Sequence, residues 1–290
     1  MKGIILINAY LNSREYLYEA ERLQEEFSRL HVSAEIKRID DYPLIIADGK
    51  IKNELADFDF CVYLDKDKYA LTMLEKAGVK VFNSANAIMT CDDKMTTYIA
   101  LSESGAPMLK TLPGILCYDQ KEQIKEKSIL KIEKELEYPL IVKESYGSLG
   151  KRVYLVKNRA ELLSTLEIVK TKPHLLQEYV RESEGRDLRV IVIGQKVVGG
   201  MERISNGDFR SNVGAGGVGK ATMVGDEVKN IAESIAKTLD LDYCGIDFLE
   251  KEDGVVVCEV NSNAFFYTFE RVTNINVAKI YSEYIVSKIK

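Results

Sequence analysis

The first 90 residues alternate wholly apolar strand patterns with helical ones, and this alternation limits the fold more than any other feature. Residues 4–7 (Ile-Ile-Leu-Ile) lack polar side chains, which is typical of a parallel strand that helices cover on both faces. A helical apolar stripe follows over about 13–30. Further patterns indicate strands at 34–39, 58–64 and 79–82 and a helix at 71–77. We therefore expect an open α/β domain over residues 1–90.

Beyond residue 90 the pattern changes to α+β, with short strands that follow one another through tight turns. No Gly-x-Gly-x-x-Gly sequence follows the first strand, which disfavours a dinucleotide-binding domain. We expect a central small α+β domain over 91–180 and a C-terminal antiparallel-sheet domain over 181–290. The predicted helices are 92–103, 121–137, 226–239 and 276–289, and the predicted strands are 140–143, 153–156, 174–179, 188–193, 196–201, 243–250 and 255–260.

Charge and cysteine usage exclude several classes of function. The net charge is -5, so nothing indicates a nucleic-acid partner. The five cysteines form no Cys-x-x-Cys pair, and no signal or membrane segment is present, which predicts a cytoplasmic protein with reduced thiols. The two histidines, His31 and His174, lie far apart in sequence, which argues against a zinc site and a Ser-His-Asp triad.

Three oxygen-bearing side chains converge on the predicted C-terminal hairpin. Glu259 and Asn261 share one face of a strand because side chains alternate, and Asp247 lies on the preceding strand. Both strands are otherwise apolar, so carboxylates beside them are costly unless a cation offsets their charge. We therefore predict an Mg²⁺ site at these residues. The alternative is an exposed hairpin with ordinary acids.

A glycine-rich loop follows a predicted strand that ends at Lys143. Gly147, Ser148 and Gly150 can turn backbone N–H groups toward a phosphate, and Lys143 can reach the same anion. The Walker A pattern Gly-x-x-x-x-Gly-Lys-Ser/Thr is absent. By itself the segment is equally consistent with a hairpin turn.

The segment Gln177-Glu178-Tyr179-Val180 ends another strand with backbone donors and acceptors that suit an adenine edge. Asp187 follows and is placed to bind ribose hydroxyls. An ordinary strand end is the alternative for both.

Arg189, Arg203 and Arg210 flank a second glycine-rich stretch over 205–220. Arginines clamp phosphoryl groups during transfer, and several of them beside such a loop are more suggestive than one alone.

In this order, the motifs resemble the ATP-grasp superfamily, and within it the RimK-like branch of glutamate and amino-acid ligases. The resemblance covers roughly residues 80–265, and the N-terminal domain more weakly. The matching stretches are Asn-Ser-x-x-Ala-Ile at 83–88, Asp-Lys-x-x-Thr at 93–97, Gly-x-Pro at 105–107, Lys143 with the loop 147–150, the hinge 177–180, Asp-x-Arg at 187–189, Gly-Asp-Phe-Arg-Ser-Asn at 207–212, Gly-Gly at 216–217, Gly-Ile-Asp-Phe at 245–248 and Glu-Val-Asn at 259–261.

The resemblance implies an ATP-grasp fold and a role for each matching residue. Lys94 and Lys143 would contact the nucleotide phosphates, together with the loop residues Gly147, Ser148 and Gly150. The hinge residues would meet the adenine and Asp187 the ribose, and Asn212 would also contribute to the nucleotide site. Arg203 and Arg210 would face the transferred phosphate and the acyl group, with Arg189 beside them. Asp247, Glu259 and Asn261 would hold two Mg²⁺ ions, with Mn²⁺ as an alternative metal.

The implied reaction is ATP-dependent amide formation through an acylphosphate, with release of ADP and phosphate. The expected partners are an amino-acid donor or acceptor and a peptide, protein or small-molecule co-substrate, and a homo-oligomer is also expected. Two alternatives are a non-catalytic nucleotide-sensing protein and a ligase of the D-alanine or glutathione type. The chain departs from the branch pattern at 262–266 (Ser-Asn-Ala-Phe-Phe), which leaves the acceptor pocket unassigned.

Overall fold

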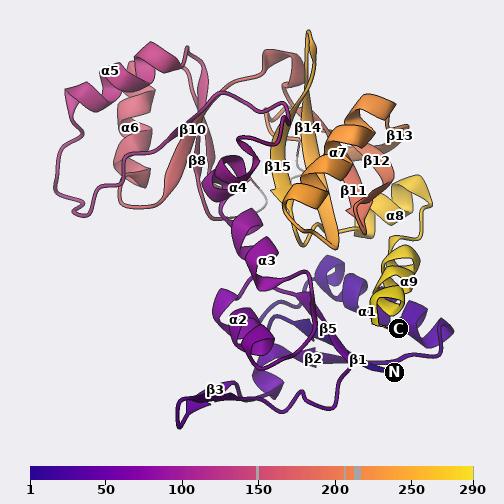
Figure 1. Cartoon of the computed structure of the whole chain (residues 1–290). Coiled ribbons are helices and arrows are strands. Elements are labelled where there is room, and N and C mark those ends of the chain that lie inside the picture. Colours follow the sequence, from indigo (N-terminus) through magenta and orange to yellow (C-terminus); the bar gives the residue numbers. More distant parts are fainter. Residues whose placement is uncertain (148–149, 206, 212–216, 290) are drawn as a thin grey trace.

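The computed structural model describes residues 1–147, 150–205, 207–211 and 217–289. Figure 1 shows an N-terminal α/β domain, a smaller domain in which helices lie on one side of a sheet, and a larger sheet beside it. This arrangement confirms the expected mixture of α/β and α+β architecture. In the described part of the chain, no helix has the length and apolar character needed to cross a membrane.

The N-terminal domain contains a parallel sheet with the strand order β2-β1-β5-β6. Ile5 and Ile7 of β1 pack with residues of helix α1, whereas Ile4 and Leu6 pack on the opposite face with residues of α2. Both faces of β1 are buried, which explains why its sequence shows no polar alternation. The elements are β1 (Lys2–Ile7), α1 (Arg14–Arg29), β2 (Ser33–Arg38), β5 (Phe60–Leu64), α2 (Lys68–Lys76) and β6 (Val81–Phe82).

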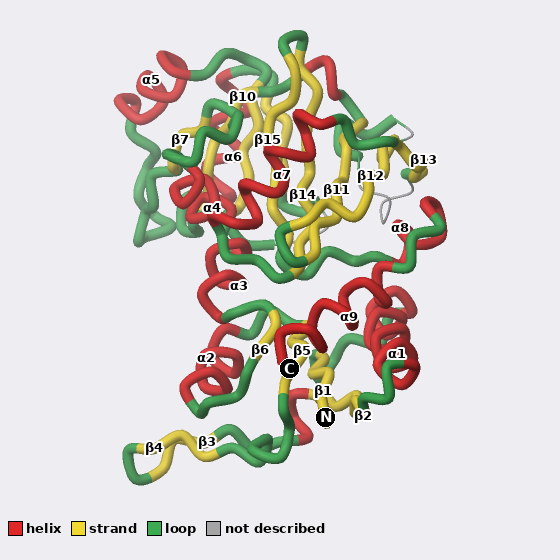
Figure 2. Tube along the Cα trace, turned by 45° about the vertical axis from the view of Figure 1, so that its right-hand side comes forward, coloured by secondary structure: helices red, strands yellow, loops and turns green. Residues whose placement is uncertain are grey.

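A hairpin that our sequence analysis does not predict projects from this domain (Figure 2). It follows the short 3-10 helix η1 (Ile39–Asp41) and consists of β3 (Ile45–Ala47) and β4 (Lys50–Lys52). Its turn residues, Asp48 and Gly49, both have positive φ angles, as a tight Asp-Gly hairpin turn requires. The Asp-Gly pair was the available signal for it.

The link to the second domain is two short helices, of which α4 corresponds to the helix expected over 92–103 and α3 is not predicted. Helix α3 (Ala85–Asp92) ends where Asp93 adopts an extended conformation, and α4 (Lys94–Leu101) begins directly after it. The Asp93 carboxylate accepts hydrogen bonds from the backbone N–H groups of Met95 and Thr96, so it caps the new helix. This break places Lys94 at the first position of α4.

The central domain is an antiparallel sheet with the order β7-β10-β8-β9 and two helices on one face. Leu140, Val142 and Leu176 pack against these helices, α5 and α6. The sequence analysis does not predict α6, whose start is capped by Asn158. The elements are β7 (Thr111–Pro113), α5 (Glu126–Glu135), β8 (Leu140–Glu144), β9 (Val153–Val156), α6 (Arg159–Val169) and β10 (His174–Glu178).

The C-terminal sheet is antiparallel, with the order β13-β12-β11-β14-β15. One face packs on α7 through Val190, Val192, Ile246 and Phe248. The opposite face bears charged side chains at one end and joins the core of the N-terminal domain at the other. After the 3-10 helix η2 (Arg181–Ser183), the elements are β11 (Arg186–Ile193), β12 (Lys196–Ile204), β13 (Val218–Thr222), α7 (Asp226–Thr238), β14 (Tyr243–Lys251) and β15 (Gly254–Asn261).

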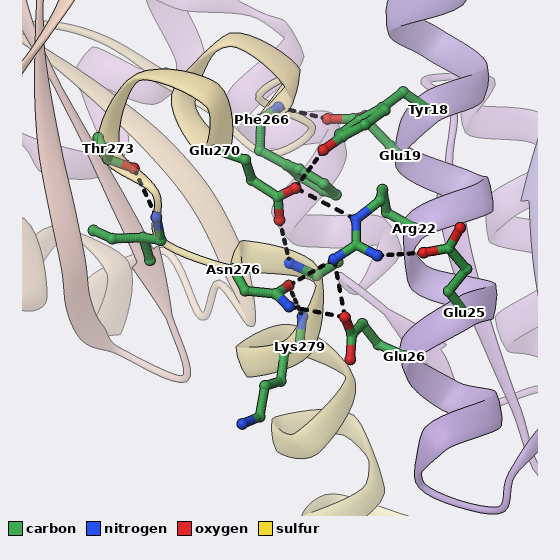
Figure 3. A network of polar contacts seen from close by, with 12 residues as sticks. Tyr18, Glu19, Arg22, Glu25, Glu26, Phe266, Glu270, Thr273, Asn276 and Lys279 are labelled. Carbon is green, nitrogen blue, oxygen red and sulfur yellow. Dashed lines mark hydrogen bonds and ion pairs between the residues drawn. The ribbon is translucent and has the colours of Figure 1, made fainter.

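The chain ends by returning to the N-terminal domain through α8 (Tyr267–Thr273) and α9 (Val277–Ile289). Val277, Ala278 and Ile285 are fully buried in the same core as α1. A polar network ties α1 to both C-terminal helices (Figure 3), with Arg22 at its centre. The predicted boundaries at residues 90 and 180 stay predictions, and the last helix packs on the first domain.

Candidate active site

The site begins with a row of charged side chains on one face of the C-terminal sheet. Arg189 pairs across the ladder with Asp247, and Asp247 pairs with Glu259. Asp187, two residues before Arg189, pairs with Arg203 on β12. Because partners directly opposite each other share a face, the sheet register brings these side chains together.

Asp247 is the centre of this row. It is buried, and its carboxylate receives two hydrogen bonds from Arg189, Nε to Oδ1 at 2.7 Å and Nη2 to Oδ2 at 2.8 Å. Arg203 forms an ion pair with the same carboxylate, with 2.8 Å between Nη2 and Oδ2. Burial alone would raise the pKa of Asp247, but the two guanidinium groups hold it below its ordinary value.

The Asp187 carboxylate lies in the same cluster. It accepts hydrogen bonds from Arg203, with 2.7 Å between Nε and Oδ1, and from the Ser211 hydroxyl. Burial raises the pKa of Asp187, Arg203 opposes this shift, and the nearby Asp247 carboxylate adds to it. The predicted contact between Asp187 and a ribose stays a prediction.

Glu259 and Asn261 lie on the same face of β15. The Lys94 ammonium is 3.3 Å from Glu259 Oε1 and donates to the Gly147 carbonyl at 2.7 Å. The Asn261 amide nitrogen is buried without a hydrogen-bond partner among the described residues. Among the described residues only Arg189 donates to Asp247 Oδ1, so this oxygen retains acceptor capacity.

The side-chain oxygens of Asp247, Glu259 and Asn261 fit a divalent cation. Two carboxylates and one amide are the hard oxygen ligands that Mg²⁺ prefers alongside phosphate oxygens. No group of three or more His, Cys, Asp or Glu side chains suited to a metal occurs in the described ranges, so the set depends on the amide of Asn261 as its third member.

The central sheet contributes a second lysine, Lys143, to the site. Lys143 is buried on β8, and its Nζ is 3.7 Å from the Cys258 sulfur. The glycine-rich loop follows, with Gly147 at φ 128° and Gly150 at φ 67°, conformations that favour glycine. Ser148 lies outside the described residues.

Cys258 is a site residue that the sequence analysis missed. It is the extra residue of a β-bulge, because Asp247 pairs with Glu259 while the next residue, Phe248, pairs with Val257. Burial raises the pKa of the Cys258 thiol, and Lys143 partly opposes this. Strict alternation along the strand does not predict such a bulge.

Arg210 connects the two sheets. Its Nη1 donates to the Gly150 carbonyl at 2.7 Å, and its Nη2 donates to Asp208 at 2.6 Å. It therefore lies at the glycine-rich loop. The predicted contribution of Asn212 falls outside the described residues.

The hinge segment follows β10 at the far end of the site. Glu178 accepts from the Lys110 backbone N–H at 2.9 Å and from the Lys251 ammonium at 3.0 Å. Gln177 Oε1 is buried without a partner among the described residues. Val180 is buried in a small apolar cluster with Tyr98. Tyr179 lies between Gln177 and Val180 in the chain. The segment thus offers a buried acceptor, Gln177 Oε1, without a partner among the described residues, and an apolar wall at Val180.

Comparison with known proteins identifies the family. A RimK-like ATP-grasp domain matches residues 91–285. The chain belongs to the RimK-like ATP-grasp family. The predicted membership and ATP-grasp fold are therefore confirmed, and the match includes every candidate site residue.

Two relatives and one solved structure show how far this likeness extends. The chain is 37% identical to human beta-citrylglutamate synthase B over 229 residues, which is 78% of this chain and 58% of that protein. It is 33% identical to a probable alpha-L-glutamate ligase of Legionella pneumophila, over 76% of this chain and 71% of that protein. The RimK-like fold is shared with a RimK domain ATP-grasp protein from Sphaerobacter thermophilus, with a TM-score of 0.71, 19% identity and coverage of 98% and 99%.

Proposed function

We propose that this protein is an ATP- and Mg²⁺-dependent carboxylate–amine ligase that forms an amide through an acylphosphate. The observation that carries the proposal is the placement of Asp247 and Glu259 opposite Lys94 and Lys143, in a chain of the RimK-like ATP-grasp family. Facing acids and lysines suit a metal–nucleotide complex, because each sign of charge has a matching group.

In this proposal, Lys94 and Lys143 neutralise the nucleotide phosphates, and the backbone of Gly147 and Gly150 closes over them. The hinge from Gln177 to Val180 holds the adenine, since it offers an unpaired acceptor and an apolar wall. Mg²⁺, when bound by Asp247, Glu259 and Asn261, would draw off the charge that develops on the phosphate oxygens.

The arginines orient the transferred group. Arg203 and Arg189 fix the Asp247 carboxylate from two directions, so its position is set before nucleotide binds. Arg210 holds the glycine-rich loop and is placed to face the acyl group. The carboxylate substrate attacks the terminal phosphate of ATP, and ADP leaves. The amine then attacks the acylphosphate, and phosphate is released as the amide forms.

We infer an amino acid, with glutamate first among the candidates, as one substrate. Support comes from the relatives, whose names are beta-citrylglutamate synthase B and alpha-L-glutamate ligase. The chain spans just over half the length of the first of these, so the co-substrate is proposed only as a class: a peptide, protein or small carboxylate.

The test is phosphate release by the purified protein with ATP, Mg²⁺, glutamate and a panel of carboxylates. Glu259→Gln should lower turnover about 100-fold, because it removes one of the proposed metal ligands. Glu250→Gln is the matched control, since Glu250 is more than half exposed on the neighbouring strand β14. Undiminished release by the Glu259 variant would refute the proposal. Nucleotide binding without turnover across the whole panel would instead favour a nucleotide sensor.

We also propose a cytoplasmic location and a homo-oligomer. The location is supported by the five cysteines, all of which are described and free. Cell fractionation and light scattering of the purified protein test the two statements separately.

A further inference from the structure

A cavity of about 340 Å³ lies in the central domain, away from the candidate active site. It opens between α5, α6 and the segment 114–125 that follows β7. Figure 1 shows both helices on the side of β8 and β10 that faces away from the C-terminal sheet. Its apolar lining comes from Leu112, Ile115, Leu116, Ile132, Leu166 and Leu176.

The wall of this cavity is a fixed part of the fold. The Gly114 N–H donates to the His174 carbonyl at 2.8 Å, and the Cys117 N–H donates to the Lys170 carbonyl at 2.7 Å. The Gln120 side chain adds a bond to the Glu167 carbonyl at 2.9 Å. The segment 114–125 is therefore held at several points against the end of α6 and the start of β10.

One polar group in the lining has an unused acceptor. His174 is only 4% exposed, and its Nδ1 is 2.8 Å from the Lys172 carbonyl. A carbonyl can only accept, so Nδ1 carries the proton and Nε2 of the neutral ring is an acceptor. No described residue donates to Nε2. Burial lowers the pKa of His174, which keeps the ring neutral.

Charges around the cavity restrict what can donate to His174. Three lysines line it, Lys125, Lys131 and Lys170, against a single acid, Glu122. The Lys170 ammonium is already engaged by the Glu122 carbonyl and the Glu167 carboxylate, each at 2.6 Å. A cationic ligand would be repelled, so a neutral hydroxyl or N–H group is the donor that fits.

We propose that this cavity binds an uncharged, largely apolar small molecule whose hydroxyl or N–H group donates to His174 Nε2. Its volume falls within the range of small-molecule sites, about 300 to 1,000 Å³. The central sheet separates the cavity from the active site. Leu176 and His174 of β10 point to the helices, whereas Lys143 of the neighbouring strand β8 points to the opposite face of the sheet. The proposal does not depend on the ligase reaction.

The probes are 4-propylphenol and propylbenzene, which differ in one hydroxyl donor. Titration of the ¹⁵N-labelled full-length protein should give saturable NMR shifts centred on residues 114–118 and His174. The phenol should bind roughly fivefold more tightly, the ratio that one net hydrogen bond gives. Equal affinity of both probes, no saturable shift, or shifts centred on 94–98 and 257–260 would overturn the proposal.

Three variants sharpen the test. Ser128→Trp fills the cavity from α5 and should abolish binding, whereas Leu130→Trp on the exposed side of the same helix should leave it intact. His174→Phe should bind both probes equally while it still gives saturable shifts. If Leu130→Trp abolishes binding as fully as Ser128→Trp, or if His174→Phe still prefers the phenol, the cavity is not the site.

Discussion

The carboxylate of Asp247 contacts both Arg189 and Arg203, and Asp247 lies opposite Glu259 on the neighbouring strand. Alternation along a strand predicts from sequence that Glu259 and Asn261 share a face. It does not predict that Arg189 and Arg203 lie against Asp247, because this depends on the register between three strands. The pairing of the Asp187 carboxylate with Arg203 depends on the same register, and its predicted contact with a ribose is not tested by this pairing.

Asp247→Asn should lower the free energy of unfolding by about 3 kcal/mol, because the buried Arg203 and the partly buried Arg189 lose the carboxylate that they share. Urea denaturation in the absence of nucleotide measures this. Glu250→Gln, on the same strand but exposed, should change stability by less than about 1 kcal/mol. Equal effects of the two substitutions would contradict the role given to the arginine pair.

Two glutamates of α1 should give opposite pH trends. Burial raises the pKa of Glu19 well above 4.5, although the Phe266 N–H opposes this. A raised carboxyl pKa destabilises the fold as pH rises from the unfolded pKa toward the folded one. Glu19→Gln should therefore gain stability relative to wild type from about pH 4.5 upward.

Glu26 is the matched control for Glu19. Burial alone would raise the pKa of Glu26, but Asn276 and Arg22 lower it. Its stabilisation is present above the unfolded pKa and is lost as pH falls through the folded value. Glu26→Gln should thus be less stable than wild type at neutral pH and approach it in acid. Thermal unfolding across pH checks both variants, and parallel trends would disprove the assignment.

At the scale of elements, the break between α3 and α4 decides where Lys94 lies. The sequence analysis predicts one helix over 92–103 and does not predict α3. The Asp93 side chain, which competes for the backbone N–H groups, separates the two helices. Two other helices, α6 and α8, are also not predicted. Helix α6 has weak amphipathic patterning, and α8 is only 7 residues long, so periodicity over a longer window does not detect either.

Asp93→Ala should cost about 1 kcal/mol of stability, the usual value of an N-cap, and should also raise the KM for ATP because Lys94 loses its fixed position. Asp67→Ala removes the matching cap of α2, where Asp67 accepts from the Tyr69 and Ala70 N–H groups. It should cost about the same stability without a change in KM. Denaturation and ATP kinetics compare the two, and an unchanged KM in the Asp93 variant would count against the placement of Lys94.

At the scale of the whole molecule, α1 is held to the C-terminal helices by a buried polar network (Figure 3). Arg22 contacts Glu26 at 2.9 Å and Asn276 at 3.1 Å, and the Tyr18 hydroxyl donates to Glu270 at 2.6 Å. The sequence analysis predicts a helix at both α1 and α9. Their contact could not be predicted, because nothing local in the sequence relates residues about 250 positions apart.

Arg22→Met should destabilise the protein by about 3 kcal/mol, because the buried Glu26 and Glu270 lose the cation that they share. Arg29→Met is the control: Arg29 pairs with the same Glu26, but its side chain is 63% exposed, so the loss should stay below about 1 kcal/mol. Denaturation with probes in the N-terminal and C-terminal sheets should show one transition for either variant. A similar loss in both would argue against a special role for the network.

The contact between α1 and α9 also has a consequence for synthesis of the chain on the ribosome. The core around α1 includes residues of β11, α8 and α9, so the N-terminal domain emerges before these elements and lacks part of its core until α9 is translated. The central domain has its own closed core within residues 112–176 and can fold earlier. A nascent chain stalled before residue 277 should therefore protect its middle from protease while its beginning is still cleaved.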